Sequence, residues 1–227
     1  MQAITIDEGF WAFEQRILLP PGLHLPTRCY VVRLEDGGLV IFNPIPKLPE
    51  AKAEIDALGP VRALIAQTSL HHLGLPAAME AWPDAKLYGI PALTRKRPDL
   101  TFHGTVDAMP APLWSGVLEQ HVIAGTTTHE VAFFHRPSHT LILADLAFHL
   151  PRPTHRLTRW FFTLTGSWGA FGPSRLFKTT IRDRRALAAS IQTLLAWQPR
   201  RIVMAHGLPV EQDATGALAR AFAFLPR

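Results

Sequence analysis

The order of apolar and polar positions divides the chain into short strands and amphipathic helices. Runs of β-branched and other apolar residues bounded by Gly, Pro or Asp predict strands, whereas apolar residues three and four positions apart predict helices. The predicted strands are 28–34, 39–42, 61–66, 86–89, 117–124, 130–135, 140–144 and 201–205. The predicted helices are 48–58, 77–82, 91–99, 184–197 and a stretch that begins at residue 213.

These elements alternate along the whole chain without a long linker. The acidic, glycine-rich link 35–38 predicts a hairpin between the first two strands. The helix 48–58 then joins 39–42 to 61–66 as a strand–helix–strand unit. Mixing of this kind indicates one α/β domain over residues 1–227.

Composition narrows the class of protein. Hydrophobic residues make up 48% and charged residues 18% of the 227 residues, so a disordered chain is excluded. Cys29 is the single cysteine, which excludes a disulfide scaffold and zinc modules that need two or more cysteines. The first residues do not resemble a signal peptide, and no apolar run approaches the roughly 20 residues of a spanning helix. We therefore expect a cytoplasmic protein with no membrane partner.

The net charge is +5, which permits an anionic partner. Short basic clusters at 95–97, 182–185 and 200–201 carry part of this excess. Basic residues alone are weak evidence for nucleic-acid binding, so we expect a small-molecule substrate rather than a nucleic acid. Nucleic-acid binding stays a third hypothesis that depends on charge alone.

Chemically active side chains follow three of the predicted buried strands. His71 and His72 come after strand 61–66, Asp145 follows strand 140–144, and His206 follows strand 201–205. Imidazole and carboxylate groups are ligands of divalent transition metals. Adjacent residues of an extended chain point in opposite directions, so His71 and His72 can share one ion only in a bent loop. Spacing alone leaves open whether these are metal ligands or ordinary structural histidines.

Three segments resemble the metallo-β-lactamase superfamily. Residues 64–74, LIAQTSLHHLG, are similar to the segment that ends a strand with T-H-x-H-x-D-H-x-G. Residues 140–148, TLILADLAF, resemble the superfamily's strand-then-aspartate segment, and 202–207, IVMAHG, resembles the strand with its last histidine. The chain is most similar to a divergent, largely uncharacterised branch. The resemblance implies an αββα four-layer sandwich, in which outer helices cover two mixed β-sheets.

The resemblance also implies which ligands are lost. Gln67 and Ser69 stand where the superfamily has two histidines of its first metal position, and Thr126 stands at the third. His129 could replace the third only if its loop shifts. The first position is therefore expected to be absent.

The second metal position is retained in the resemblance. Its expected ligands are His71 (in place of an aspartate), His72, Asp145 and His206. We expect one divalent ion, with zinc first and iron or manganese as alternatives. Four protein ligands would close a tetrahedral zinc, so a catalytic zinc needs one ligand to stay away.

The implied activity is hydrolysis of an ester, thioester, amide or phosphoester by metal-activated water, which Asp145 would help to orient. The alternative is a catalytically inactive protein of the same fold that binds a ligand or a partner. Glu130, at a strand start, is interpreted as a surface carboxylate. The aromatic segment 160–171 is expected to pack in the core or in a homodimer contact, or to form an apolar mouth over the metal loops.

Overall fold

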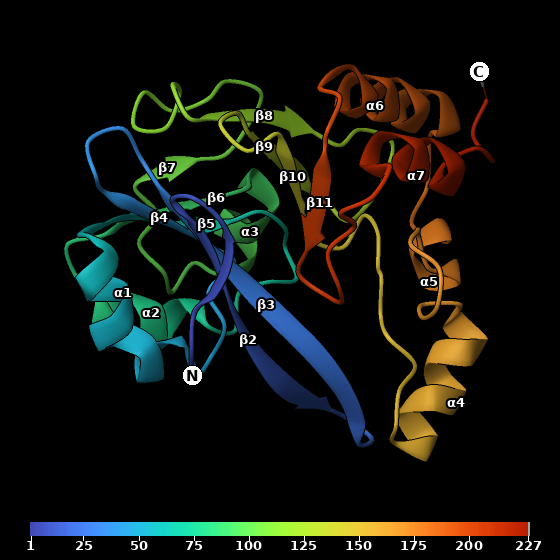
Figure 1. Ribbon diagram of the computed structural model, residues 1–227, viewed down its shortest axis with the longest axis horizontal. Helices are drawn as coiled ribbons and strands as arrows, with labels where there is room; N and C mark the ends of the chain where they lie inside the picture. The colour runs from blue at the N-terminus through green and yellow to red at the C-terminus, as the bar shows by residue number, and fades with distance from the viewer. Residues whose placement is uncertain (227) are drawn as a thin grey trace.

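Two β-sheets lie face to face in the computed structural model, which describes residues 1–226 (Figure 1). The larger sheet contains seven strands in chain order: β1 (Ile4–Asp7), β2 (Phe10–Leu19), β3 (Leu23–Arg33), β4 (Leu39–Phe42), β5 (Val61–Ala66), β6 (Lys86–Gly89) and β7 (Gly104–Thr105). The smaller sheet has the order β11-β10-β9-β8, formed by β8 (Leu118–Val122), β9 (Val131–His135), β10 (Thr140–Leu143) and β11 (Arg201–Met204). Both sheets mix parallel and antiparallel pairs.

Helices form the outer layers (Figure 1). The 3₁₀ helix η1 (Leu48–Ala51) and the helices α1 (Lys52–Leu58), α2 (Leu75–Ala81) and α3 (Pro91–Lys96) pack on the seven-stranded sheet. The helices α6 (Arg184–Ala196) and α7 (Ala214–Ala221) cover the four-stranded sheet. Of the remaining helices, α4 (Arg156–Thr165) lies beside the far end of the long β2–β3 hairpin, and α5 (Arg175–Lys178) lies between α4 and α7. The predicted four-layer αββα sandwich is confirmed. Within residues 1–226, no helix has the length and apolar character needed to cross a membrane.

Successive side chains of the smaller sheet point alternately into two apolar layers, one between the two sheets and one under the helices α6 and α7. In β10, Ile142 packs in the core between the sheets, whereas Leu141 and Leu143 pack against α6 and α7. In β11, Val203 faces the first core and Ile202 faces the second. Because successive side chains of a strand point to opposite faces, a strand buried on both sides must be apolar at every position. This is why these strands read as continuous apolar runs.

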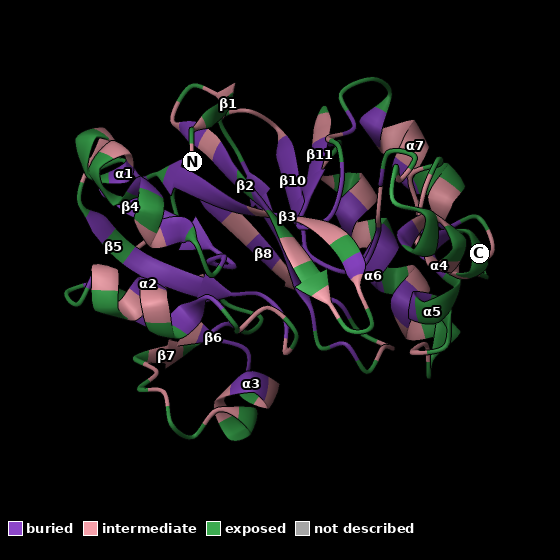
Figure 2. Cartoon of the chain, turned by 90° about the horizontal axis from the view of Figure 1, so that it is seen from below, coloured by how far each residue is buried: buried purple, intermediate pink, exposed green. Residues whose placement is uncertain are grey.

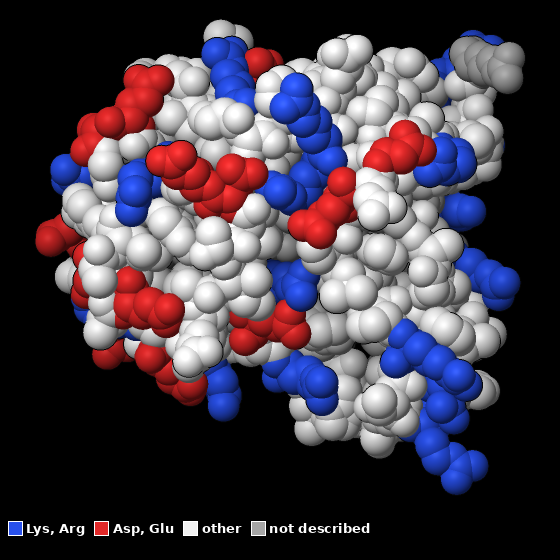
Figure 3. Space-filling model, in the orientation of Figure 1, with Lys and Arg blue, Asp and Glu red and all other residues white. Residues whose placement is uncertain are grey.

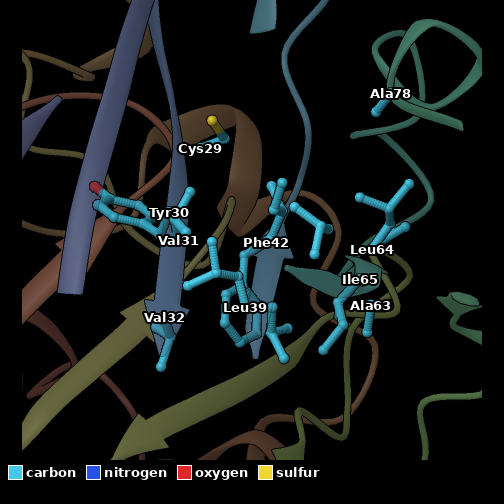
Figure 4. Packing of buried hydrophobic residues seen from close by; sticks show 14 of the residues in the cluster. Cys29, Tyr30, Val31, Val32, Leu39, Phe42, Ala63, Leu64, Ile65 and Ala78 are labelled. Carbon is cyan, nitrogen blue, oxygen red and sulfur yellow. The ribbon is translucent and has the colours of Figure 1, made fainter. Parts of the chain in front are cut away.

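The larger sheet is buried in the same way at its centre. Figure 2 shows its middle strands buried while the outer faces of the helices are exposed. Buried side chains of β3, β4 and β5 belong to the same apolar cluster as Ala78 of α2 (Figure 4). Tyr30 of β3 reaches the other sheet, where its hydroxyl donates a hydrogen bond of 2.7 Å to the carbonyl oxygen of Met204. The amide of Arg28 donates to the Ala205 carbonyl at 2.8 Å, so β3 holds the end of β11 directly.

Charge is distributed unevenly over the surface. Residues 146–182 contain six Lys or Arg and no Asp or Glu, whereas the other 190 residues contain 17 basic and 18 acidic residues. The six basic residues are Arg152, Arg156, Arg159, Arg175, Lys178 and Arg182, and within the described chain none of them forms an ion pair. Figure 3 shows basic side chains without acidic neighbours over the region of α4 and α5. The positive charge of the protein therefore belongs to one end of the molecule.

Candidate metal centre and the adjoining cavity

The ends of β5, β10 and β11 bring three of the predicted ligands together. His71 lies in the loop after β5, Asp145 is the second residue after β10, and His206 is the second residue after β11. Gly207 lets the chain turn immediately after His206, because its φ is +117° and a Cβ there would meet the carbonyl oxygen of His149. Each side chain is thus positioned by the end of a strand whose backbone is held in a sheet.

His71, Asp145 and His206 form a compact cluster. One ligand atom from each residue lies within 4.8 Å of the other two. The His71 Nε2 atom is 3.3 Å from Asp145 Oδ1, and the His206 Nε2 atom is 3.6 Å from the same oxygen. The three side chains are at most 10% exposed. This is a donor set of two imidazole nitrogens and one carboxylate oxygen that converge on a common point.

Burial and neighbouring charges define the protonation of the cluster. Burial acts to raise the pKa of Asp145, but the His71 and His206 rings and the Thr68 hydroxyl outweigh it and lower the pKa to about 2. Burial lowers the pKa of His206 to about 4, and His71 adds to that shift. His206 is therefore neutral at pH 7, and its Nδ1–H donates to the Pro26 carbonyl at 3.0 Å. Its Nε2 lone pair is left free to face Asp145.

His71 has the opposite shift. Burial acts to lower its pKa, but the negative charges of Asp145 and Glu130 prevail and raise the pKa above its usual value. In the absence of a cation, His71 therefore tends to hold a proton beside Asp145. Two carboxylates near one another in a buried region make this position favourable for positive charge.

Thr68 and Glu130 support Asp145, and sequence reasoning missed both roles. The Thr68 hydroxyl donates to Asp145 Oδ2 at 3.3 Å and accepts the backbone N–H of Leu70 at 3.0 Å. Glu130 is fully buried, which corrects its interpretation as a surface residue. Its carboxylate accepts the N–H groups of Ala144 at 2.7 Å and Asp145 at 2.9 Å, so it fixes the backbone at the end of β10. Burial and the charge of Asp145 raise the pKa of Glu130 to about 7.

Solved structures share the fold of this chain over nearly its whole length. A metallo-β-lactamase from Pontibacter korlensis is 15% identical with a TM-score of 0.67, and the alignment covers 98% of both chains. The mono-zinc form of the metallo-β-lactamase FIM-1 from Pseudomonas aeruginosa is 11% identical with a TM-score of 0.69, over 98% of this chain and 95% of that one. A metallo-β-lactamase from Erythrobacter litoralis with β-mercaptoethanol in its active site is 14% identical with a TM-score of 0.69, over 98% and 96%.

The protein has the metallo-β-lactamase fold. The resemblance found in the sequence is thereby confirmed at the level of the fold. Residues 7–93 also match the model of a domain of unknown function, DUF4336. No curated protein matches the sequence. Low identity together with a match to an uncharacterised domain places the chain in a divergent branch of this fold.

Gln67 stands where the resemblance expects a histidine of the first metal position, and in the structure its side chain has other partners. Its side chain is fully buried and accepts a hydrogen bond from Asn43 Nδ2 at 2.7 Å. Its Nε2 group donates to the carbonyls of Val131 at 3.0 Å and Ile142 at 3.3 Å. Gln67 therefore joins the end of β5 to β9 and β10 of the other sheet, and all its side-chain atoms capable of hydrogen bonding are engaged.

The other residues at the first position do not form a ligand set. Ser69 is half-buried, and its carbonyl oxygen accepts a hydrogen bond from Lys96. The Thr126 hydroxyl pairs with that of Thr128 at 3.0 Å, and His129 is exposed. Among residues 1–226, the cluster of His71, Asp145 and His206 is the single group of three or more His, Cys, Asp or Glu side chains with ligand geometry.

His72 is the predicted ligand that the structure does not bring to the cluster. Its Nδ1 atom lies 2.9 Å from Nη1 of Arg97, which also donates to the His72 carbonyl at 3.4 Å. Partial burial and the positive charges of Lys96 and Arg97 lower the pKa of His72. His71 and His72 thus point to different partners, as alternation along the backbone would suggest.

A cavity of about 510 Å³ opens directly onto the cluster. All three candidate ligands line it, together with Phe161 and Phe162 of α4. Its volume is within the range of about 300–1,000 Å³ that is typical of small-molecule sites. The aromatic segment thus contributes part of a cavity wall, while Trp160 is 64% exposed.

Proposed function

We propose that the protein is a metal-dependent hydrolase with one divalent ion, held by His71, Asp145 and His206. The observation that carries this proposal is the convergence of two imidazole nitrogens and one carboxylate oxygen within 4.8 Å at three strand ends. The adjoining cavity gives a substrate access to the same point. Metal ligands that a substrate could not reach would support a structural metal site instead.

The donor set fits a catalytic zinc. Catalytic zinc sites commonly have three protein ligands and keep the fourth position open, whereas structural sites are closed by four. Because His72 is held by Arg97, three protein ligands remain and one position is free. Two histidines and one carboxylate also suit Fe²⁺, and Mn²⁺ remains an alternative. Zinc is our first expectation because FIM-1, which has the same fold, is described in a mono-zinc form.

Several residues of the chain would prepare the reaction. A bound divalent cation supplies Lewis acidity and lowers the pKa of water. Asp145 is the catalytic residue in this proposal, because its carboxylate can accept a hydrogen bond from the attacking water while Thr68 restrains Oδ2. The Pro26 carbonyl fixes the tautomer of His206. Glu130 keeps the backbone of Asp145 in place.

Metal content and thermal stability test the proposal together. Protein purified without chelator should contain about one metal ion per chain, and chelation should lower its Tm, because a ligand at 100 times its Kd adds about 2.7 kcal/mol of stability. Asp145→Asn and His71→Ala should abolish the chelator effect. His129→Ala is the matched control, since His129 is an exposed histidine outside the cluster.

Three outcomes would contradict the proposal. Absence of metal, combined with a melting curve that ignores both zinc and chelator, would favour the inactive binding protein. Two ions per chain, with one lost in His129→Ala, would show that the first metal position is present after all. Metal binding without hydrolysis of any ester, thioester, amide or phosphoester would leave the site structural.

A further inference from the structure

Most of the side chains that line the cavity outside the candidate metal centre are apolar. On one side lies the β2–β3 hairpin, whose register pairs Ile17 with Leu25 and Leu19 with Leu23. All four of these side chains line the cavity, as do Phe161 and Phe162 of α4 on the other side. Cross-strand neighbours on one face of a hairpin lie side by side, so the pairs form a continuous apolar stripe. The stripe runs along the cavity wall.

The polar groups of the cavity are already engaged or belong to the metal cluster. The Ser174 hydroxyl caps α5 by accepting the N–H of Phe177 at 2.9 Å, and those of Thr165 and Ser167 pair at 2.7 Å. Among the described residues that line the cavity there is no Lys, Arg or Glu, and its only ionisable side chains are His71, Asp145 and His206. Outside that cluster, a phosphate, a nucleotide or a carboxylate on the substrate would therefore find no Lys or Arg side chain in the described lining.

The rim of the cavity is apolar as well. Leu73, from the loop that carries His71, is 61% exposed, and Leu176 of α5 is 60% exposed. Both belong to the cavity lining, so they mark its opening. On the hairpin side, the amide of His24 donates to Thr158 Oγ1 of α4 at 3.0 Å, which holds the two walls together. The result is a mainly apolar cavity that opens to solvent and reaches the cluster.

We propose that this cavity binds the straight hydrocarbon chain of an acyl ester or thioester, with the acyl carbonyl at the His71–Asp145–His206 cluster. The inference rests on the proposed hydrolase function and assigns its substrate class. Hydrolysis would add water across the acyl–oxygen or acyl–sulfur bond, which gives a carboxylic acid and an alcohol or a thiol. Chain length sets the affinity, because each methylene transferred from water into an apolar site improves binding by about fourfold.

Binding can be measured without metal or turnover. Calorimetric titration of the metal-free protein with straight-chain alkan-1-ols from butanol to decanol should show that Kd falls by about fourfold per methylene. The fall should stop once the chain fills the cavity. Esters of p-nitrophenol with acyl groups of four to twelve carbons should show the same trend in kcat/KM for the zinc-loaded protein. A Kd that is independent of chain length would overturn the inference.

Two neighbouring residues of β2 provide a matched pair of variants. Ile17 is half-buried in the cavity wall, whereas Leu18 points to the opposite face of the hairpin and is 67% exposed. Ile17→Trp should fill the cavity and weaken decanol binding at least tenfold, while Leu18→Trp should leave it unchanged. Thr165→Phe fills the cavity from α4 and replaces Ile17→Trp if that variant does not fold.

The outcomes separate the two proposals. Equal decanol affinity in the Ile17→Trp and Leu18→Trp proteins would refute the assignment of the cavity. Alcohol binding that depends on chain length, without ester hydrolysis by the zinc-loaded protein, would refute the hydrolase function and keep the cavity as a chain-binding site. Hydrolysis that favours short acyl groups would keep the hydrolase and refute the substrate class.

Discussion

Replacing Gln67 with alanine should destabilise the protein strongly, although Gln67 is not one of the candidate ligands. The change removes three buried side-chain hydrogen bonds, to Asn43, Val131 and Ile142. Each bond contributes about 1 kcal/mol net, and a buried donor such as Asn43 Nδ2 left without this partner adds about 1–3 kcal/mol. Together with the space left by the side chain, the expected loss is at least about 4 kcal/mol. The total free energy of unfolding of a typical domain is about 5–15 kcal/mol.

Equilibrium unfolding in urea measures this loss directly. Wild type and Gln67→Ala should unfold with similar m-values, so that the shift in midpoint reports the change in the free energy of unfolding. Gln192→Ala is the control, because Gln192 is an exposed glutamine on α6 and its loss should change stability by no more than about 0.5 kcal/mol. A loss below about 1 kcal/mol in Gln67→Ala would show that Asn43 and the two carbonyls find other partners, and would refute the role of Gln67 as a junction between the sheets.

Further predictions concern pH, metal and thiol chemistry. Burial lowers the pKa of His135 from 6.5 to about 4, so the native state binds fewer protons than the unfolded state between these values. The free energy of unfolding should therefore fall by up to about 3 kcal/mol through His135 as the pH falls from 6.5 to 4. His135→Gln should make the free energy of unfolding less dependent on pH in this range. Parallel curves for the wild type and the variant would contradict this prediction. His72→Ala should retain bound metal, whereas His71→Ala should lose it; equal metal content in the two variants would be inconsistent with the geometry. Burial raises the pKa of Cys29 to about 12, so a thiol reagent should label it only after unfolding, and rapid labelling of the native protein would disprove its burial.

Most of what the sequence predicted about the site concerned polar residues that follow apolar strands. Asp145 and His206 each follow a fully apolar run, and a run of that kind indicates a strand buried on both faces. A polar residue just beyond such a strand must sit at a sheet edge, where loops from neighbouring strands meet. His71 could be added on the same argument. Local pattern placed these residues after buried strands, and the resemblance was needed to single them out as expected metal ligands.

His72, Gln67 and Glu130 show where local pattern is insufficient. The direction of His72 depends on Arg97, which is 25 residues away. Gln67 takes partners from β9 and β10, and its role depends on the packing of two sheets. Glu130 can be buried because two backbone N–H groups at the end of β10 donate hydrogen bonds to its carboxylate. The one available signal for Glu130 was an acidic residue at the start of the mostly apolar strand Val131–His135, and that signal is equally typical of a surface carboxylate.

The uneven charge makes the molecule an electric dipole, with its positive pole at α4 and α5. The electric field of a polyanion would orient this protein before the two molecules touch, with the positive pole toward the polyanion. At physiological ionic strength the bias extends about 8 Å from the surface, and it should disappear in high salt. Since α4 also forms one wall of the cavity, the same rotation would bring that wall toward the polyanion.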